Sequence, residues 1–425
     1  MEHEKLSLRA NFVWTLAGNV IYSGCQWGML VAIAKLGTPV MVGQFALGLA
    51  ISAPVFMLTN LQLRAVQATD ARHEFRFGHY LALRLLGTGL ALLAILTVSL
   101  AAGYQKETFV VILDVALAKA AESVSDVLYG LWQNRERLDK ISIAMIGRGI
   151  ASLTALTTIF YLTHEITYAV SALALVWGTW LLTYECSVAR SLLRAEAQDP
   201  FRPEWQGDRL KTLATLSLPL GLVMLTISLN TNIPRYLLEH YHGEAALGYF
   251  AAMAYVLVAG TTVMDALCQS ATPRFARYYL SDRVAFRWLL FKTLGVAIGL
   301  GLAGLGLVLL GGKLILALLY KPEYAQYASI FTLLMVAGCV NFLASALGYA
   351  FTSTRRFRAF VIPGVCNTSL GAIIGFLLIP AMGLRGAAFT VITISVGQLV
   401  FLSLLLWIAL RKQPVSNEQA SPSII

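Results

Sequence analysis

Charged residues are scarce in this sequence. Of its 425 residues, 13% are Asp, Glu, Lys or Arg, whereas 58% are hydrophobic. A soluble domain has roughly 25% charged residues, so the composition excludes an ordinary soluble protein and indicates an integral membrane protein. The net charge of +10 is therefore a topology signal first, and it does not indicate a nucleic-acid partner.

Sequence motifs for metal, nucleotide or covalent chemistry are also missing. The chain has no G-x-x-x-x-G-K-[ST], no H-E-x-x-H and no C-x-x-C, and no nucleophile–base pair is evident. We therefore expect no enzyme, no cofactor and no bound metal. The five cysteines lie in apolar stretches, which predicts free thiols in the core and no disulfide. They are Cys25, Cys186, Cys268, Cys339 and Cys366.

Long apolar runs dominate what remains. A membrane-spanning helix needs about 20 mostly apolar residues, and twelve segments qualify. Gly and Pro within these runs argue against a β-barrel, whose strands alternate in polarity. The predicted fold is all-α, with twelve transmembrane helices. The segments are Phe12–Leu36, Met41–Leu63, Leu81–Ala102, Phe109–Trp132, Ile141–Leu162, Thr167–Leu193, Leu213–Leu238, Ala245–Gln269, Trp288–Leu310, Ala325–Phe351, Phe360–Pro380 and Leu384–Leu410.

The spans divide into two halves that resemble each other. A polar stretch at 194–212 separates a six-helix bundle at 1–193 from a second one at 213–411, and 412–425 is predicted to be a disordered tail. Val42–Ala46 (VGQFA) in the second span matches Leu247–Ala251 (LGYFA) in the eighth. Six spans per half give a parallel repeat, which predicts an axis along the membrane normal and a binding site between the bundles.

Lysine and arginine are distributed unequally between the two membrane sides. With the N-terminus in the cytoplasm, 25 of the 32 basic residues fall on or near the cytoplasmic side, Arg84 and Arg148 among them, and six fall on the other side. Cytoplasmic loops carry an excess of Lys and Arg, so both termini are predicted to be cytoplasmic.

The fourth span is unusual because it carries Asp114, Lys119, Glu122 and Asp126. A mid-membrane charge costs roughly 2.5–3.5 kcal/mol, so these side chains must face protein or water. At about 100° per residue, Lys119, Glu122 and Asp126 fall within about 60° of one another, and Asp114 lies about 80° from Glu122, so the four charges are predicted to form one polar stripe. The stripe is either a structural ion pair, Lys119 with Glu122, or a cavity wall in which Lys119 meets a phosphate.

Three further polar residues lie in the seventh span. Asn230 and Asn232 can hydrogen-bond sugar hydroxyls or join neighbouring helices. Arg235 lies near the external end, where it either reaches the interface or guards the outer mouth of a cavity.

Other polar side chains also have two interpretations. Arg148 in the fifth span either extends to the cytoplasmic interface or forms a cationic inner mouth. Asn19, Tyr22 and Gln26 recur at helical spacing in the first span, where they line the cavity or hydrogen-bond between helices.

Four stretches resemble the oligosaccharide flippases of the O-antigen type, in the multidrug/oligosaccharidyl-lipid/polysaccharide exporter superfamily. They are Asn11–Asn19 (NFVWTLAGN), Val42–Gly48 (VGQFALG), Asn60–Arg64 (NLQLR) and Leu319–Tyr324 (LYKPEY). The resemblance extends over the whole chain in architecture. It implies transport of a polyprenyl-pyrophosphate-linked glycan across a bacterial inner membrane, with pyrophosphate and sugars in a central cationic cavity. Lys119, Arg148 and Arg235 are the residues that can serve this role here.

We therefore expect a flippase that works by alternating access, with the lipid bilayer and the lipid-linked glycan as partners and a glycan polymerase or ligase as a further candidate partner. Asp114, Glu122 and Asp126 are the expected carriers if transport is coupled to an ion gradient. Two alternatives stay open. One is an exporter of small amphipathic cations, in which the carboxylates bind the drug; the other is a non-transporting scaffold of a glycan-assembly complex.

Overall fold

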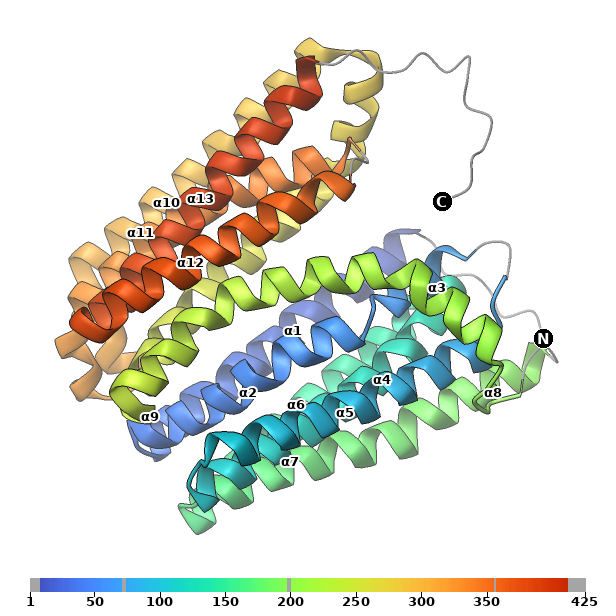
Figure 1. Ribbon diagram of the computed structural model, residues 1–425, viewed down its shortest axis with the longest axis horizontal. Helices are drawn as coiled ribbons and strands as arrows, with labels where there is room; N and C mark the ends of the chain where they lie inside the picture. Colours follow the sequence, from blue (N-terminus) through green and yellow to red (C-terminus); the bar gives the residue numbers. More distant parts are fainter. Residues whose placement is uncertain (1–7, 71–73, 197–199, 355–356, 412–425) are drawn as a thin grey trace.

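A computed structural model describes residues 8–70, 74–196, 200–354 and 357–411 of the chain, and in these residues all regular structure is helical. Figure 1 shows two groups of long helices. The helices are α1 (Leu8–Leu36), α2 (Pro39–Thr59), α3 (Leu63–Thr69), α4 (Phe77–Ala102), α5 (Lys106–Asn134), α6 (Leu138–Thr163), α7 (Ile166–Trp180), α8 (Cys186–Glu196), α9 (Gly207–Ser281), α10 (Arg283–Leu319), α11 (Ala328–Thr352), α12 (Val361–Met382) and α13 (Leu384–Arg411).

Three short helical segments complete the described structure. A π-helical turn, Leu181–Glu185, joins α7 to α8, so these two helices form one span. Two 3-10 helices, Pro322–Tyr327 and Phe357–Phe360, precede α11 and α12.

The predicted all-α membrane fold is confirmed. Among the described residues, ten helical stretches are long and apolar enough to cross a membrane. One of them, α9, contains the seventh and eighth predicted spans, because the helix breaks at Gly243 (φ 78°, ψ 177°) and turns back. The left-handed φ is one that glycine adopts readily. The charged fourth span is α5, a 29-residue helix that is not among the ten.

The second predicted span ends earlier than expected. Its predicted end was Leu63, but α2 ends at Thr59 and α3 begins at Leu63. Leu61 and Gln62 between them have φ of 52° and 53°, so the chain turns sharply there. At the other end of α2, Pro39 takes the first helical position, where its missing N–H is no loss, and Thr38 caps the backbone N–H of Met41.

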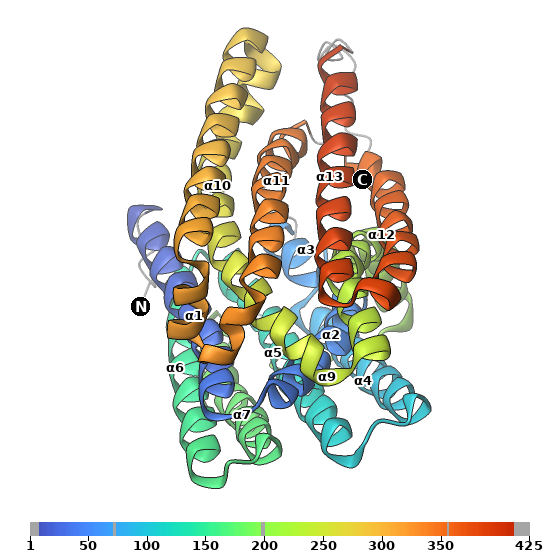
Figure 2. The same ribbon diagram turned by 90° about the vertical axis from the view of Figure 1, so that its left-hand side faces the viewer.

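Helices α1 to α8 form a first bundle, and α9 to α13 form a second one (Figure 2). The bundles contact each other mainly through α2 and α9, and they diverge toward the end where α1 begins and α13 ends (Figure 1). We call the opposite end, near Gly243 and the turn from α1 to α2, the closed end. The predicted boundaries at 193 and 212 remain predictions, and the predicted tail at 412–425 lies outside the described residues.

Four groups of atoms join the bundles at the closed end. Glycines of α2 and α9 bring the two backbones together, since a Cβ on Gly43 would collide with the carbonyl oxygen of Glu244. Three hydrogen bonds accompany this contact. Thr108 donates to Glu244, Tyr236 donates to the carbonyl of Ala50, and Lys321 donates to the carbonyl of Gly37.

The cysteine prediction is partly wrong. All five thiols are free, and Cys25, Cys186 and Cys268 are buried, but Cys339 is only half-buried and Cys366 is exposed on α12. The apolar sequence of a span does not indicate which of its faces points into the bundle, and the face that carries Cys366 is exposed.

Candidate functional site

Three charged residues of α5 lie on a cavity of about 600 Å³ in the first bundle. Lys119, Glu122 and Asp126 all line it, so three of the four residues of the predicted polar stripe share one surface, and Asp114 is not among the lining residues. Helices α2 and α3 supply the opposite wall, including Asn60 and Arg64. Because Lys119 is in the middle of a 29-residue helix, the cavity reaches the middle of the bundle.

Small residues allow α5 to hold this position. Its central turns are rich in alanine, which favours helix and permits close packing between helices in a membrane. Gly48 of α2 faces Val115 of α5, and a Cβ there would lie 3.0 Å from the valine side chain. The backbones of α2 and α5 therefore approach closely just beyond the cavity.

Glu122 is held by two cations. The Nζ of Lys119 lies 2.6 Å from its Oε2, and a nitrogen of Arg148 lies 3.7 Å from its Oε1. Tyr22 of α1 also donates a hydrogen bond to Glu122 at 3.1 Å, and Gln26 donates to Tyr22 at 2.6 Å. The predicted Lys119–Glu122 pair is present, and Tyr22 and Gln26 join it.

Arg148 is not at the cytoplasmic interface, so the interpretation of Arg148 as an interfacial side chain is wrong. Its side chain is 3% exposed, and its guanidinium carbon lies 4.5 Å from the ring centre of Trp177 and 5.3 Å from that of Tyr22. Stacking on aromatic faces and the pairing with Glu122 compensate the buried charge. The buried Arg148 therefore helps to hold the carboxylate of Glu122 in place.

Asp126 is also held by two cations. Arg84 of α4 donates to it at 2.9 Å, and Arg64 lies 3.7 Å away. The side chain of Arg84 is fully buried, although the sequence count placed it with the cytoplasmic charges. Arg84 is held inside the bundle because its counter-charge, Asp126, lies on α5.

Cations outnumber acids in this cluster. Glu122 contacts Lys119 and Arg148, and Asp126 contacts Arg84 and Arg64, which leaves two positive charges in excess. One more acid, Glu185 in the π-helical turn, is fully buried and accepts a hydrogen bond from Tyr129 at 2.8 Å. With Glu185 included the cluster is still positive.

The other predicted residues are not part of this cluster. Asp114 faces α7, where Ser171 donates a hydrogen bond to it. Asn19 is exposed and bonds the carbonyl of Thr15 in its own helix. Asn232 is buried and bonds Ser228 in the same way. Asn230 and Arg235 line a separate cavity in the second bundle.

Sequence reasoning missed Arg84 and Glu185 as interior charges. A signal existed for Glu185, because an ionisable residue well inside a predicted span is unusual. For Arg84 the signal was its place inside the predicted third span. Trp177 and Tyr129 gave none, since aromatic residues are common in apolar helices.

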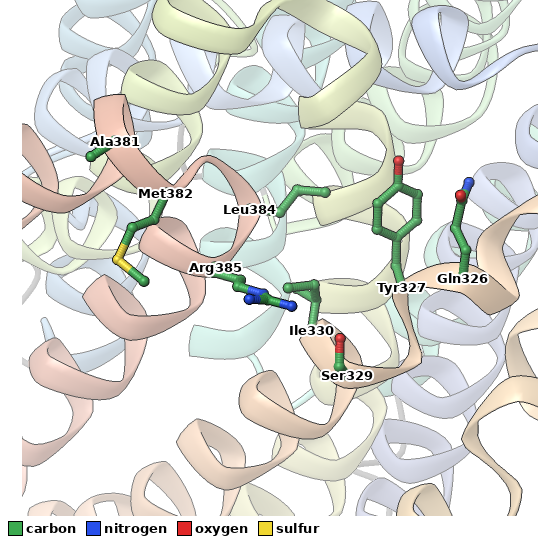
Figure 3. Close-up of a pocket in the computed structure, with 8 residues that line it drawn as sticks. All are labelled: Gln326, Tyr327, Ser329, Ile330, Ala381, Met382, Leu384 and Arg385. Atoms are coloured by element: carbon green, nitrogen blue, oxygen red, sulfur yellow. The ribbon is translucent and has the colours of Figure 1, made fainter.

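A third cavity, of about 580 Å³, lies between α11 and α13 in the second bundle (Figure 3). Arg385 points into it beside Ser329 and Ile330, and Met382 lies at its rim. It is formed where α12 ends and α13 begins, on the closed-end side of the second bundle. It shares no residue with the charged cluster.

Comparison with known proteins agrees with this architecture. Residues 8–279 match the model of a family described as polysaccharide biosynthesis protein. The capsular polysaccharide biosynthesis protein CapF of Staphylococcus aureus is 28% identical over 394 residues, which cover 91% of this chain and 95% of CapF.

Solved structures show the same fold. The lipid II flippase MurJ in an inward closed conformation has a TM-score of 0.73 at 12% identity, covering 93% of this chain and 87% of MurJ. An inward-facing multidrug resistance MATE family transporter of the MOP superfamily has a TM-score of 0.63 at 18% identity and covers 98% of both chains. The family resemblance inferred from the sequence is confirmed by the match over residues 8–279, and the solved structures show the fold.

Proposed function

The chain belongs to the polysaccharide biosynthesis protein family, and we propose that it is a flippase that carries a polyprenyl-pyrophosphate-linked oligosaccharide across the bacterial inner membrane. The observation that carries this proposal is the positive charge cluster around Lys119 at mid-span. A pyrophosphate is the anionic part of such a substrate, and a lysine ammonium is a strong point-charge partner for phosphate. Lys119 is itself paired with Glu122, and the arginines that also contact Glu122 and Asp126 leave the cluster with excess positive charge for the substrate.

The proposed mechanism is alternating access. Both ends of the described chain lie where the bundles diverge (Figure 1), and the excess of Lys and Arg assigns that end to the cytoplasm. The structure then corresponds to a state that is open to the inside and shut at the outer end by α2 and α9. The headgroup would enter from the cytoplasm, meet Lys119, and leave when the α2–α9 contact opens. A glycan polymerase or ligase would receive it outside.

An exporter of small amphipathic cations is the second candidate, because MATE transporters share the fold. Such a substrate needs a free carboxylate, but Glu122 and Asp126 each contact two cations. The charge balance therefore favours an anionic substrate. Resistance to cationic dyes on expression would support the exporter, and loss of surface glycan on deletion would support the flippase.

The decisive experiment measures translocation of labelled lipid-linked oligosaccharide in proteoliposomes. We expect Lys119→Ala to lower the rate at least tenfold in folded protein, while Lys106→Ala, an exposed lysine at the start of the same helix, leaves it unchanged. An unaltered rate in Lys119→Ala would remove the phosphate site from α5. Absence of translocation by the wild type would leave the scaffold and exporter functions.

A further inference from the structure

The second bundle has its own cavity, of about 380 Å³, which lies between α9, α11 and α13. Its volume is within the range of small-molecule sites, roughly 300–1,000 Å³. Apolar side chains alternate with polar ones along its wall, an arrangement that suits a ligand with both C–H faces and hydroxyl edges. The polar side chains used below are Asn230, Arg235, Asp265, Asn341, Ser345 and Gln398.

This cavity differs in charge from the one in the first bundle. It has one acid, Asp265, and one base, Arg235, so its lining is formally neutral, and amides and hydroxyls provide the remaining polarity. Each side-chain amide offers two donors and an acceptor. A sugar hydroxyl both donates and accepts, so amides match it better than a fixed charge does. A pyrophosphate, in contrast, would find no excess of positive charge here.

Several polar atoms of the cavity lack a protein partner. The Oδ1 of Asn230 and the Nε of Arg235 are buried and form no hydrogen bond with the described residues. Asn341 and Gln398 form no side-chain hydrogen bond within the described chain either. Buried polar groups in proteins are nearly always paired, so the two buried atoms of Asn230 and Arg235 call for an explanation, whereas Asn341 is half-buried and Gln398 is exposed.

These amides therefore differ from those that join or brace helices. Asn232 bonds Ser228 at 2.9 Å, and Asn367 of α12 bonds the carbonyl of Ile394 on α13 at 3.2 Å. Each of these two amides donates to a carbonyl of the protein, although the Oδ1 of Asn367 has no hydrogen-bond partner among the described residues. Asn230, Asn341 and Gln398 present unused donors and acceptors to the cavity.

The two cavities are lined by helices that contact each other, because α2 lines the first cavity and packs on α9, which lines the second. The guanidinium carbon of Arg235 is 6.0 Å from the centre of the Tyr255 ring on the same helix. An elongated ligand between the bundles would contact the cation of the first bundle and the neutral cavity of the second. We infer that this second cavity binds the neutral sugar units of the substrate, and this inference rests on the proposed flippase function.

In this arrangement, Lys119 binds the pyrophosphate, and the amides of Asn341 and Gln398 bind the sugars. Binding then requires both bundles, so the glycan itself contributes to holding them together in the inward-facing state. Selection between glycans would depend on the second bundle, because the first one contacts the invariant pyrophosphate.

The test compares two probes on purified protein in detergent. One is undecaprenyl pyrophosphate without sugars, and the other is the lipid-linked oligosaccharide extracted from source membranes. The variants are Gln398→Met and Asn341→Leu/Gln398→Met. Gln398 is exposed and its side chain has no hydrogen-bond partner among the described residues, so Gln398→Met has little reason to misfold. Gln326→Met in the third cavity is the matched control (Figure 3).

We expect the wild type and Gln326→Met to bind the glycan-bearing lipid more tightly than the bare one. The double variant should lose about tenfold in affinity for the glycan-bearing lipid, as expected for one or two lost hydrogen bonds, with Gln398→Met intermediate. Affinity for the bare lipid should stay the same in all variants.

The inference is overturned if the double variant binds both probes more weakly by the same factor, or binds both as the wild type does. It is also overturned if the wild type does not prefer the glycan-bearing lipid. In these cases the second cavity has no sugar site, but the proposed flippase function is unaffected. If the wild type binds neither lipid, the proposed function fails and the inference fails with it.

Discussion

Gly43 of α2 and Gly248 of α9 pack against each other's helices in a reciprocal way. A Cβ on Gly43 would strike the carbonyl oxygen of Glu244, and a Cβ on Gly248 would strike that of Pro39. Glu244 lies four residues before Gly248, just as Pro39 lies four residues before Gly43. The two segments that match in sequence thus meet face to face, as a two-fold axis between the bundles requires.

Gly248→Ala is therefore expected to prevent the closed end from sealing. Alanine normally stabilises a helix by about 1 kcal/mol relative to glycine, so any loss must come from the contact between α2 and α9. Spin labels at Thr38 and Glu323, both exposed at the closed end, should report longer distances in the variant. Transport should fall, because one of the two alternating states is destabilised.

Gly295→Ala provides the control for Gly248→Ala. Gly295 lies on α10 with no atom within 4 Å of the added Cβ, so the distances and the transport rate should match the wild type. If Gly248→Ala behaves like Gly295→Ala, the glycine contact does not control the closed end.

Asp126→Asn should destabilise the protein more than Arg84→Met. Removing the carboxylate leaves the fully buried Arg84 without a counter-charge, and breaking a buried ion pair in this way typically costs about 3–5 kcal/mol. Removing Arg84 leaves Asp126, which is 29% exposed and still contacts Arg64. Thermal unfolding in detergent, followed for both variants, measures the difference.

The double variant Arg84→Met/Asp126→Asn completes the thermodynamic cycle. Because it leaves no buried charge unpaired, it should be more stable than Asp126→Asn alone. Equal melting temperatures for the two single variants would show that the arginine has another source of compensation.

The helices could be predicted from the sequence because the length of an apolar run alone decides whether it spans a membrane. The repeat was predictable for a related reason, since Gly43 and Gly248 occupy matching places in two similar segments. The break at Gly243 falls in the predicted gap between the seventh and eighth spans, whereas the end of α2 at Thr59 was not predicted, because the φ values of Leu61 and Gln62 depend on the contacts of the folded chain.

The candidate site was only partly predictable. The angular positions of Lys119, Glu122 and Asp126 follow from helix geometry, so their common surface could be derived. The partners of Glu122 and Asp126 could not, because Arg148 and Arg84 come from other helices whose rotation a single sequence does not determine. The sequence left Arg148 either at the interface or at a cationic inner mouth and counted Arg84 with the cytoplasmic charges, whereas packing buries both side chains.

If transport is coupled to protons, Asp114 is the expected carrier among Asp114, Glu122 and Asp126. Glu122 and Asp126 each contact two cations. Asp114 contacts only the hydroxyl of Ser171 among the described residues, so no cation is paired with it. Asp114→Asn should abolish stimulation of transport by a pH gradient.

Two variants check the role of Asp114. Ser171→Ala keeps the carboxylate and should keep the stimulation by the pH gradient. Glu122→Gln should lower the transport rate but leave the relative stimulation unchanged. Stimulation that survives Asp114→Asn, or that disappears with Glu122→Gln, would assign coupling to another group.

The hydrogen bonds of Thr108 should stabilise the contact between the bundles at the closed end. It accepts a hydrogen bond from Gln44 at 3.2 Å and donates one to Glu244, so it connects α2, α5 and α9. Burial, with Glu239 and Glu244 nearby, raises the pKa of Tyr104 in the adjoining turn to about 12, so this phenol stays neutral and adds no negative charge. Thr108→Val keeps the shape of the side chain but leaves Gln44 and Glu244 without their partner.

Thr108→Val should therefore shift the population toward the state in which the closed end is open. A lost hydrogen bond to a charged group is worth about 1.5–3 kcal/mol, enough to change a two-state ratio more than tenfold. The labels at Thr38 and Glu323 measure this ratio directly, and Thr108→Ser, which keeps the hydroxyl, should restore the closed distance. If valine and serine give the same distances, Thr108 does not hold this end together, and the glycine contact with the Tyr236 and Lys321 hydrogen bonds is sufficient.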